Sequence, residues 1–541
     1  MKEPLPAHVR ALLRKGAYTR PVRRIELIQT HISYVFLVDD EVYKLKKAVD
    51  FGFVDFSTLA KRKAACEAEV RLNRRGCPGG VYLGVEPLTR RDGRYYAGPS
   101  TGLRAGGEGE AVDYLVHMKR LPREGMMDRL LARGEVDFEM IGRVAARLAE
   151  LHREAERGPE ISRIGGYETQ AKNWRDSLAL VRPFVGRTLG ERRFARIEAF
   201  AASFLRDEEP LLRRRVAEGR VRDCHGDLRS DAVCFDPSLP GGICIYDCIE
   251  FNDAFRYGDT GLDAAFLAMD LDYRGRPDLS DLFVGLYAAA VGDKELPLLL
   301  DLFKCYRALV RGKVESLLLE DRDVGARQKA EARRRARRYF RLAESYTRRK
   351  RRRVLVLVTG PSGSGKSVLA GVLAARLRAV LLSTDMVRRE LFAERGRGAQ
   401  VDAGIYTPEA RQRVYAELER EAAAFLAAGR PVVADGTFIE RRQREPVERL
   451  ARTNRARLLV VQCWAPDEVV RERQARREEE AWATSEGRWE VYLAQKARAE
   501  PATEVLESQR LAIDTTRPFS EQIEAVEERL QERRRADPPS P

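Results

Sequence analysis

Long hydrophobic runs are absent from this sequence. No apolar stretch reaches the roughly 18 to 20 residues that a membrane-spanning helix requires, and the N-terminal segment 1–10 lacks the apolar core of a signal peptide. We therefore expect a cytoplasmic protein that has no membrane partner.

Cysteine and histidine are also scarce, with eight and five residues in a chain of 541. No two cysteines stand in a Cys-x-x-Cys pair and few histidines lie near them, so neither a zinc site nor a disulfide framework is indicated. We expect the cysteines to be reduced.

Negative charge is in deficit. Lysine and arginine number 98 against 83 acidic residues, which leaves a formal net charge of +15. A basic surface attracts nucleic acid and nucleotides, but solvated, arginine-rich helix faces explain the same excess and are the favoured interpretation. The densest cluster, at 347–353, is as typical of a linker or a helix end as of a nucleic-acid patch.

The most informative segment is a glycine-rich octamer, Gly360-Pro361-Ser362-Gly363-Ser364-Gly365-Lys366-Ser367. It follows an apolar stretch at 354–358 and precedes an expected helix, which is the context of a phosphate-binding loop. Glycines let backbone N–H groups turn toward a polyphosphate, and the helix N-terminus adds a favourable field. Lys366 would reach the β- and γ-phosphates of ATP, and the Ser367 hydroxyl would hold Mg²⁺.

The pattern of strands and helices predicts two domains. After residue 353 the expected elements alternate, with strands at 354–358, 379–383, 431–435 and 457–463 and helices at 367–377, 408–428 and 440–452. Such alternation indicates a parallel sheet between two layers of helices. We expect a P-loop domain at 351–535 and a disordered tail at 536–541. Residues 1–350 are expected to form a β-rich small lobe (about 20–120, with a helix at 59–75) and a helical lobe (about 121–350).

Two motifs in the N-terminal half carry a resemblance. They are Cys224-His225-Gly226-Asp227-Leu228-Arg229 and Ile243-Cys244-Ile245-Tyr246-Asp247. In this order they resemble the catalytic loop and the metal-binding segment of the aminoglycoside phosphotransferase family, whose bilobal fold is protein-kinase-like. The resemblance covers residues 20–320 and implies that Asp227 orients the acceptor hydroxyl and that Asp247 holds Mg²⁺.

The same resemblance implies further site residues. Lys44 would bind phosphate and pair with Glu69, and adenine would lie beside Met118. The segment 249–253 is similar to that of a subgroup in which this domain is fused to a P-loop domain. Asp259 and Asp263 are expected to cap helices or to hydrogen-bond the catalytic loop.

One position departs from the family pattern, because Ala232 stands where a metal-binding Asn is expected. Asp231 or Glu250 could supply the missing ligand. There is also no glycine-rich loop at 29–34, so an active kinase and a degenerate nucleotide-binding domain both remain open. Lys46 and Lys47 are expected at the surface.

In the C-terminal half, Asp385 and Arg388 follow the end of the second strand. The ends of parallel strands face the ligand crevice, and this Asp-x-x-Arg resembles P-loop kinases of the polynucleotide-kinase, zeta-toxin and gluconate-kinase type. The resemblance implies that Asp385 accepts the proton of the attacking hydroxyl and that Arg388 binds a substrate anion. A plain ion pair within a helix is the alternative.

Four further residues complete the expected C-terminal site. Asp435 would lie in the Mg²⁺ shell and Thr437 at the substrate. Arg473 and Arg477 share a helix face and would form a lid over the transferring phosphate.

The sequence thus predicts an α/β and α+β protein that uses ATP and Mg²⁺ to phosphorylate a hydroxyl group. The acceptor is a small molecule or, less favoured, a nucleic-acid end. The alternative is a regulatory protein that binds nucleotides and has a degenerate N-terminal kinase domain.

Overall fold

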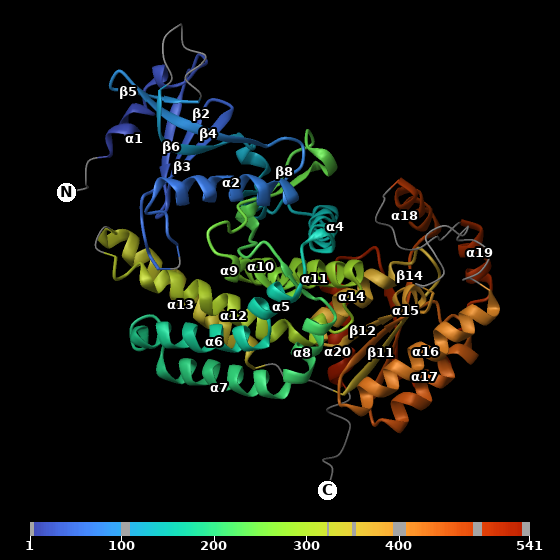
Figure 1. The fold of residues 1–541 in the computed structure, drawn as a ribbon. Helices are drawn as coiled ribbons and strands as arrows, with labels where there is room; N and C mark the ends of the chain where they lie inside the picture. Colours follow the sequence, from blue (N-terminus) through green and yellow to red (C-terminus); the bar gives the residue numbers. More distant parts are fainter. Residues whose placement is uncertain are drawn as a thin grey trace. The chain divides into compact units, whose positions relative to one another are not determined.

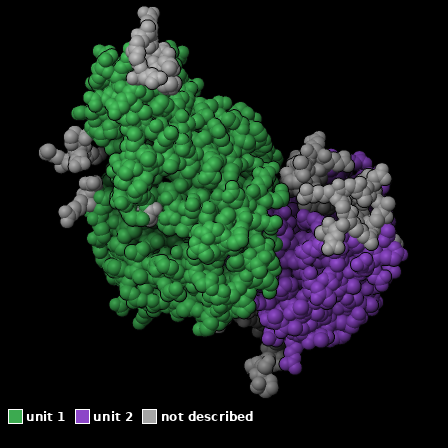
Figure 2. Space-filling model, viewed as in Figure 1, with its two compact units in different colours: residues 1–270, 306–341 green, residues 271–305, 342–541 purple. Residues whose placement is uncertain are grey.

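The computed structural model describes residues 5–52, 54–98, 109–321, 324–348, 353–392, 407–479 and 489–532. The chain forms two compact units, shown in Figure 2. Unit 1 comprises residues 1–270 and 306–341, and unit 2 comprises residues 271–305 and 342–541. The basic cluster at 347–353 lies partly outside the described residues, and the expected tail at 536–541 lies wholly outside them.

Unit 1 begins with a six-stranded antiparallel sheet in the order β1-β2-β3-β6-β4-β5 (Figure 1). Helix α2 (Leu59–Gly76) packs against this sheet and begins at Thr58, whose side chain accepts a hydrogen bond from the N–H group of Lys61. The strands are β1 (Ile25–Gln29), β2 (Ser33–Val38), β3 (Glu41–Lys46), β4 (Tyr82–Arg91), β5 (Arg94–Ala97) and β6 (Glu110–Lys119).

The rest of unit 1 is mostly helical. The short strands β8 (Val233–Phe235) and β9 (Ile243–Ile245) form an antiparallel hairpin between the segment 224–229 and Asp247. The other elements that lie wholly in unit 1 are α1 (Ala7–Ala11), α3 (Met127–Arg133), α4 (Phe138–Glu154), α5 (Pro159–Gly165), α6 (Tyr167–Val181), α7 (Glu191–Asp207), α8 (Glu209–Ala217), β7 (Val221–Asp223), α9 (Asp253–Arg256) and β10 (Tyr257–Asp259). Three helices continue from one unit into the other: α10 (Thr260–Tyr273), α12 (Leu296–Leu317) and α13 (Ala326–Tyr346).

Unit 2 is built on a five-stranded parallel sheet in the order β12-β13-β11-β14-β15. Every residue of β11, β12 and β13 is buried, as expected for strands with helices on both faces. Helices α14 and α20 pack on one face, and α16 and α17 lie on the other (Figure 1). The elements are α11 (Pro277–Val291), β11 (Val354–Thr359), α14 (Lys366–Leu377), β12 (Val380–Ser383), α15 (Thr384–Leu391), α16 (Pro408–Ala427), β13 (Val432–Asp435), α17 (Arg441–Thr453), β14 (Arg457–Trp464), α18 (Asp467–Glu479), α19 (Trp489–Ala497), β15 (Arg510–Asp514) and α20 (Phe519–Glu532).

This architecture confirms the predicted fold class. A β-rich region precedes a helical one in unit 1, and unit 2 has a parallel sheet between helices. The short helix α15 was not predicted; it begins at Ser383, whose hydroxyl accepts a hydrogen bond from the N–H group of Asp385. Among the described helices, none is both long and apolar enough to cross a membrane.

The segment 271–305 belongs to unit 2 although it precedes the parallel sheet by some fifty residues. Its helix α11 packs directly on α14, and the two backbones touch. A Cβ atom built on Gly285 would lie 2.4 Å from the carbonyl carbon of Gly371. Only glycine fits at this crossing.

Two polar contacts reinforce the attachment of this segment. The N–H group of Leu381 in β12 donates to the carbonyl oxygen of Lys294 at 3.0 Å. The Nε atom of Arg378 donates to Oδ1 of Asp301 at 2.7 Å, and both side chains are buried. The segment is therefore part of the scaffold that supports α14.

One expectation is wrong: a disulfide joins Cys77 and Cys244, so not all cysteines are reduced. Cys77 ends α2 and Cys244 is the middle residue of β9, which ties the helix to the strand that precedes Asp247. The other six cysteines are free and buried.

We expect Gly285→Ala to lower the free energy of unfolding of unit 2 by about 1 to 3 kcal/mol or more, because the added methyl group overlaps the α14 backbone. The control is Gly142→Ala in α4, where nothing lies within 4 Å of the new Cβ. That variant should be neutral or more stable by about 0.5 to 1 kcal/mol, since alanine favours helices. Urea unfolding monitored by circular dichroism measures both, and equal destabilisation by the two would contradict the close approach.

Alkylation of the unfolded, unreduced protein should modify six cysteines rather than eight. Peptide mapping by mass spectrometry should recover one linked pair that contains Cys77 and Cys244. Modification of all eight thiols would show that this bond is absent from the purified protein.

Candidate functional site

The octamer forms a tight loop between β11 and α14, and its glycines are required by conformation and by space. The angle φ is +150° at Gly360, +82° at Gly363 and +81° at Gly365, values that other residues rarely adopt. A Cβ atom on Gly363 would lie 2.7 Å from Cγ1 of Val470, and one on Gly365 would lie 3.0 Å from Cβ of Thr515. The loop is thus closely covered by α18 and by the end of β15.

Hydrogen bonds from two neighbouring strand ends hold this loop. The carbonyl oxygen of Thr437 accepts from the Thr359 hydroxyl at 2.5 Å and from the N–H group of Gly360 at 3.2 Å. Near β15, the hydroxyl of Thr515 donates to the carbonyl oxygen of Ser364 at 2.8 Å. Thr437, predicted at the substrate, therefore also supports the loop through its backbone.

Lys366, Ser367 and Asp435 converge beside the loop. Burial raises the pKa of Asp435, while nearby Lys366 and the neighbouring hydroxyl groups of Ser367 and Ser383 act to lower it. Its Oδ2 atom accepts from the Ser383 hydroxyl at 3.1 Å, but its buried Oδ1 atom has no hydrogen-bond partner among the described residues. A buried, unpaired carboxylate oxygen next to a serine hydroxyl fits the oxygen-only ligand preference of Mg²⁺.

Asp385 lies in the first turn of α15, and Arg388 follows it one turn later. Nη1 of Arg388 donates to Oδ1 of Asp385 at 2.7 Å, so the plain helix ion pair is formed in this structure. Asp385 also lies close enough to Asp435 for its charge to raise the pKa of that carboxyl group. The pair therefore lies at the phosphate loop as well as within its own helix.

Two residues beside Thr437, Tyr415 and Phe438, were not singled out in the sequence. The hydroxyl groups of Tyr415 and Thr437 are 2.8 Å apart, and the Tyr415 ring meets that of Phe438 edge to face. Tyr415 comes from α16, whose repeat of buried residues gives no sign of a polar role.

The expected lid arginines are described in part. Arg473 donates from Nη1 to the Thr515 hydroxyl at 2.9 Å and from Nη2 to the Thr515 carbonyl oxygen at 2.8 Å. Its Nη1 atom is 3.2 Å from the place that a Cβ on Gly365 would occupy, so it lies against the loop. The side chain of Arg477 lies outside the described residues.

In unit 1, Lys44 contacts Glu69, the partner that the resemblance implies, and also Asp247, which was expected to hold Mg²⁺. Its Nζ atom is 2.9 Å from Oε1 of Glu69 and 3.2 Å from Oδ1 of Asp247. Burial alone would lower the pKa of Lys44, but Glu69 and Asp247 raise it well above its usual value. In turn, Lys44 holds the pKa of Asp247 below its usual value. Met118 is buried on β6, opposite Val42 of β3.

The expectation that Lys46 is exposed is wrong. Lys46 is 2% exposed, and its Nζ atom lies 2.7 Å from Oε2 of Glu69 and also contacts Oε1 of Glu250. Strand periodicity places it on the same face as Lys44, two residues away. Glu250, one possible substitute for the missing metal ligand, is thereby held in a buried ion pair.

The other possible substitute is also paired. Oδ2 of Asp231 is 2.9 Å from Nη1 of Arg229, whose Nε atom is 3.4 Å from Oδ1 of Asp227. The guanidinium group of Arg229 thus lies between the expected catalytic carboxylate and its acidic neighbour. Ala232 is buried and offers no ligand atom.

Asp263 supports the loop 224–229, which was expected to be catalytic, by hydrogen bonds as predicted. Its two carboxylate oxygens accept from the N–H groups of His225 and Gly226 at 3.0 and 2.9 Å. Burial acts to raise the pKa of Asp263, but hydrogen bonding to His152 holds it far below its usual value. The compact group of His152, Cys224 and Asp263 is therefore explained as a loop support.

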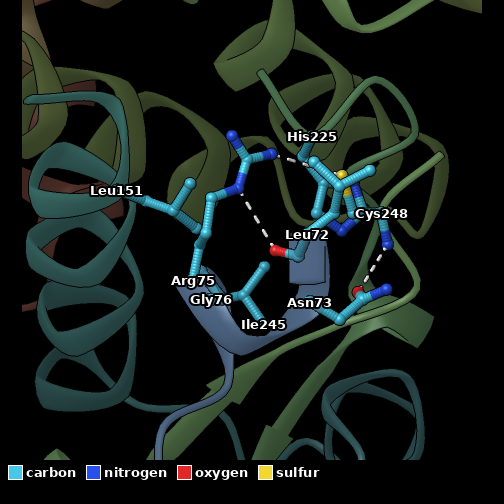
Figure 3. A pocket seen from close by; sticks show the side chains of 8 residues that line it. All are labelled: Leu72, Asn73, Arg75, Gly76, Leu151, His225, Ile245 and Cys248. Atoms are coloured by element: carbon cyan, nitrogen blue, oxygen red, sulfur yellow. Dashed lines mark hydrogen bonds between the residues drawn. The ribbon is translucent and has the colours of Figure 1, made fainter. Parts of the chain in front are cut away.

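The catalytic loop also meets the end of α2 (Figure 3). Nε2 of His225 lies 2.8 Å from the carbonyl oxygen of Tyr246, and Oδ1 of Asn73 accepts from the N–H group of Cys248 at 2.8 Å. These side chains leave a narrow pocket that is too small to hold a water molecule; its lining residues are Leu72, Asn73, Arg75, Gly76, Leu151, His225, Ile245 and Cys248. The loop, the helix of Glu69 and the segment after Asp247 thus form one packed group.

Comparison with known proteins gives matches to each part of the chain. Residues 355–502 match the AAA_33 family, described as an AAA domain. A putative kinase from Chloroflexus aurantiacus is 23% identical in a match that covers 34% of this chain and 98% of that protein, with a TM-score of 0.28. A putative aminoglycoside phosphotransferase from Ralstonia eutropha is 12% identical over 63% of this chain and 98% of that protein, with a TM-score of 0.33.

Matches to three curated relatives each cover most of the chain. The uncharacterized protein Rv2004c of Mycobacterium tuberculosis is 33% identical over 477 residues, which are 88% of this chain and 90% of that protein. A match of this length extends through both units. The chain therefore belongs to the protein family of Rv2004c and carries an AAA_33 domain in its C-terminal part.

Proposed function

We propose that unit 2 is an ATP-dependent kinase that transfers the γ-phosphoryl group of ATP to a hydroxyl group. The observation that carries this proposal is the convergence of Lys366, Ser367, Asp435 and Asp385 on one phosphate-binding loop. These residues lie at the carboxyl ends of β11, β12 and β13, where parallel sheets bind their ligands.

The proposed roles follow from the chemistry of each group. Lys366 neutralises charge on the β- and γ-phosphates, and the loop N–H groups donate to phosphate oxygens. The acceptor oxygen attacks the γ-phosphorus, its proton passes to the carboxylate of Asp385, and the bond from phosphorus to the bridging oxygen breaks to release ADP. Arg388, already hydrogen-bonded to Asp385, would orient that carboxylate or bind an anionic acceptor.

Ser367 and Asp435 would hold Mg²⁺. When bound, the ion supplies positive charge to the phosphates. The buried and unpaired Oδ1 atom of Asp435 supports this assignment.

We propose that unit 1 binds a second nucleotide through Lys44 and Asp247. A particular observation favours regulation over catalysis there: both acidic residues that could replace the ligand missing at Ala232 are already paired, Glu250 with Lys46 and Asp231 with Arg229. Phosphoryl transfer in related folds relies on two metal-binding positions, so binding without efficient transfer is the second candidate function.

Lys366→Ala should lower ATP hydrolysis by about 100-fold or more, because it removes one preorganised charge from the phosphate site. Asp385→Asn should lower transfer by about 100-fold or more while Mg·ATP affinity stays the same, since the lost group acts on the acceptor. Each variant is assayed in two ways. One assay measures ATP hydrolysis, in which water is the acceptor, and the other measures transfer to pooled sugars, nucleosides and 5′-hydroxyl oligonucleotides. Lys172→Ala, which removes an exposed lysine of α6, is the control; loss of activity there or full activity in Lys366→Ala would refute the assignment.

The role of unit 1 can be tested in the full chain that carries Lys366→Ala, so that unit 2 is silent. Lys44→Met should weaken nucleotide binding about tenfold or more, because a charged hydrogen bond is lost. If unit 1 is regulatory, Asp227→Asn should leave binding intact and change no turnover. Turnover that disappears with Asp227→Asn would instead identify unit 1 as an active kinase.

A further inference from the structure

Helix α18 places a buried, unpaired amide group against the phosphate-binding loop. Gln474 is 7% exposed, and neither its Oε1 nor its Nε2 atom has a hydrogen-bond partner among the described residues. A Cβ atom built on Gly363 would lie 3.3 Å from Nε2 of Gln474. The amide therefore lies beside the middle of the loop.

Such a side chain is unfavourable in the free protein. Burial removes the amide from water, and no protein hydrogen bond compensates for the loss. Val470, one turn earlier on the same helix, contacts the same glycine with a methyl group, so an apolar residue can fill this kind of position. A buried polar group without a partner calls for an explanation, and a ligand is one.

The surroundings of Gln474 are those of a polyphosphate site. The preceding residue on α18, Arg473, lies against Gly365 in the same loop. From α19, Oε1 of Gln495 accepts from the N–H group of Ser362 at 2.7 Å, so a glutamine side chain already reaches one of the loop donors. In the same loop, the buried Oγ atom of Ser364 also lacks a hydrogen-bond partner among the described residues.

We propose that Gln474 binds the triphosphate of the bound nucleotide, with its amide N–H group as donor to a phosphate oxygen. This inference rests on the proposed function of unit 2. Backbone N–H groups of the loop surround the phosphates, and Gly363 stands in the middle of that loop. The phosphates are therefore the part of the nucleotide nearest to Gln474.

The test measures Mg·ATP binding to the full chain by calorimetry. Only the binding that is lost in Lys366→Ala is assigned to unit 2 and compared between variants. Gln474→Leu should bind about 10- to 100-fold more weakly, the range for a hydrogen bond to a charged group. Its unfolding midpoint without nucleotide should be unchanged or higher, because the unpaired amide is gone. Gln474→Glu should bind more weakly still, since a carboxylate repels phosphate. Glu472→Gln, at an exposed position of the same helix, should bind as the wild type does.

Affinity within twofold of wild type for Gln474→Leu would overturn the proposal and leave Gln474 as a packing residue. An equal loss for adenosine and ATP would place the contact at the base and would also overturn it. If the wild-type chain shows no binding that Lys366→Ala removes, the proposed function of unit 2 fails, and this inference fails with it.

Discussion

The position of α14 is the constraint on which unit 2 depends. This helix carries Lys366 and Ser367 in its first turn, and its apolar side, with Leu369 and Leu373, lies in the core of the sheet. On α11 the backbone of Gly285 meets the backbone of Gly371 with no room for a side chain. Protein interiors are close-packed. A shift of α11 or of the sheet would therefore also move α14 and the phosphate loop at its N-terminus.

A buried charge network has the corresponding role in unit 1. The network is a chain of ion pairs in which Lys44 contacts Glu69, Glu69 contacts Lys46, and Lys46 contacts Glu250. Each charge therefore faces a charge of opposite sign. Such a network is worth little as a source of stability, because desolvation offsets the attraction. Its consequence is positional: it fixes Lys44 beside Asp247 and keeps Glu250 away from a metal-binding role.

The sequence predicted the strands of unit 2 closely, because apolar runs bounded by turns mark a buried parallel sheet. The strand expected at 457–463 is observed at 457–464, and the helix expected at 408–428 at 408–427. The disulfide could not be predicted, since 167 residues separate its two cysteines and no spacing signals the pair. Nothing in the composition of 271–305 distinguishes it from the helices on either side, so its place in unit 2 was not visible.

The missed site residues share one physical cause. Lys46 and Gln474 are polar residues at positions where periodicity indicates burial, two residues from Lys44 in a strand and four from Val470 in a helix. Residue type predicts exposure and periodicity predicts the opposite. Such conflicts between local rules are expected at functional sites. The sequence contains the conflict but cannot say which rule prevails, because Glu69 and Glu250 beside Lys46, and Gly363 beside Gln474, lie far away in the chain.

The glycine at position 371 has a consequence for where this chain can be divided. In a P-loop domain without α11, this point of α14 would face solvent, and a residue with a side chain would fit there. Here the preceding segment supplies the cover, so the surfaces of α11 and α14 have to match each other at this point. Division of the chain at the basic cluster would separate α11 from α14 and expose an apolar surface of α14 to water. The segment 271–305 and the sheet of unit 2 therefore have to remain on one chain for α14 to stay covered.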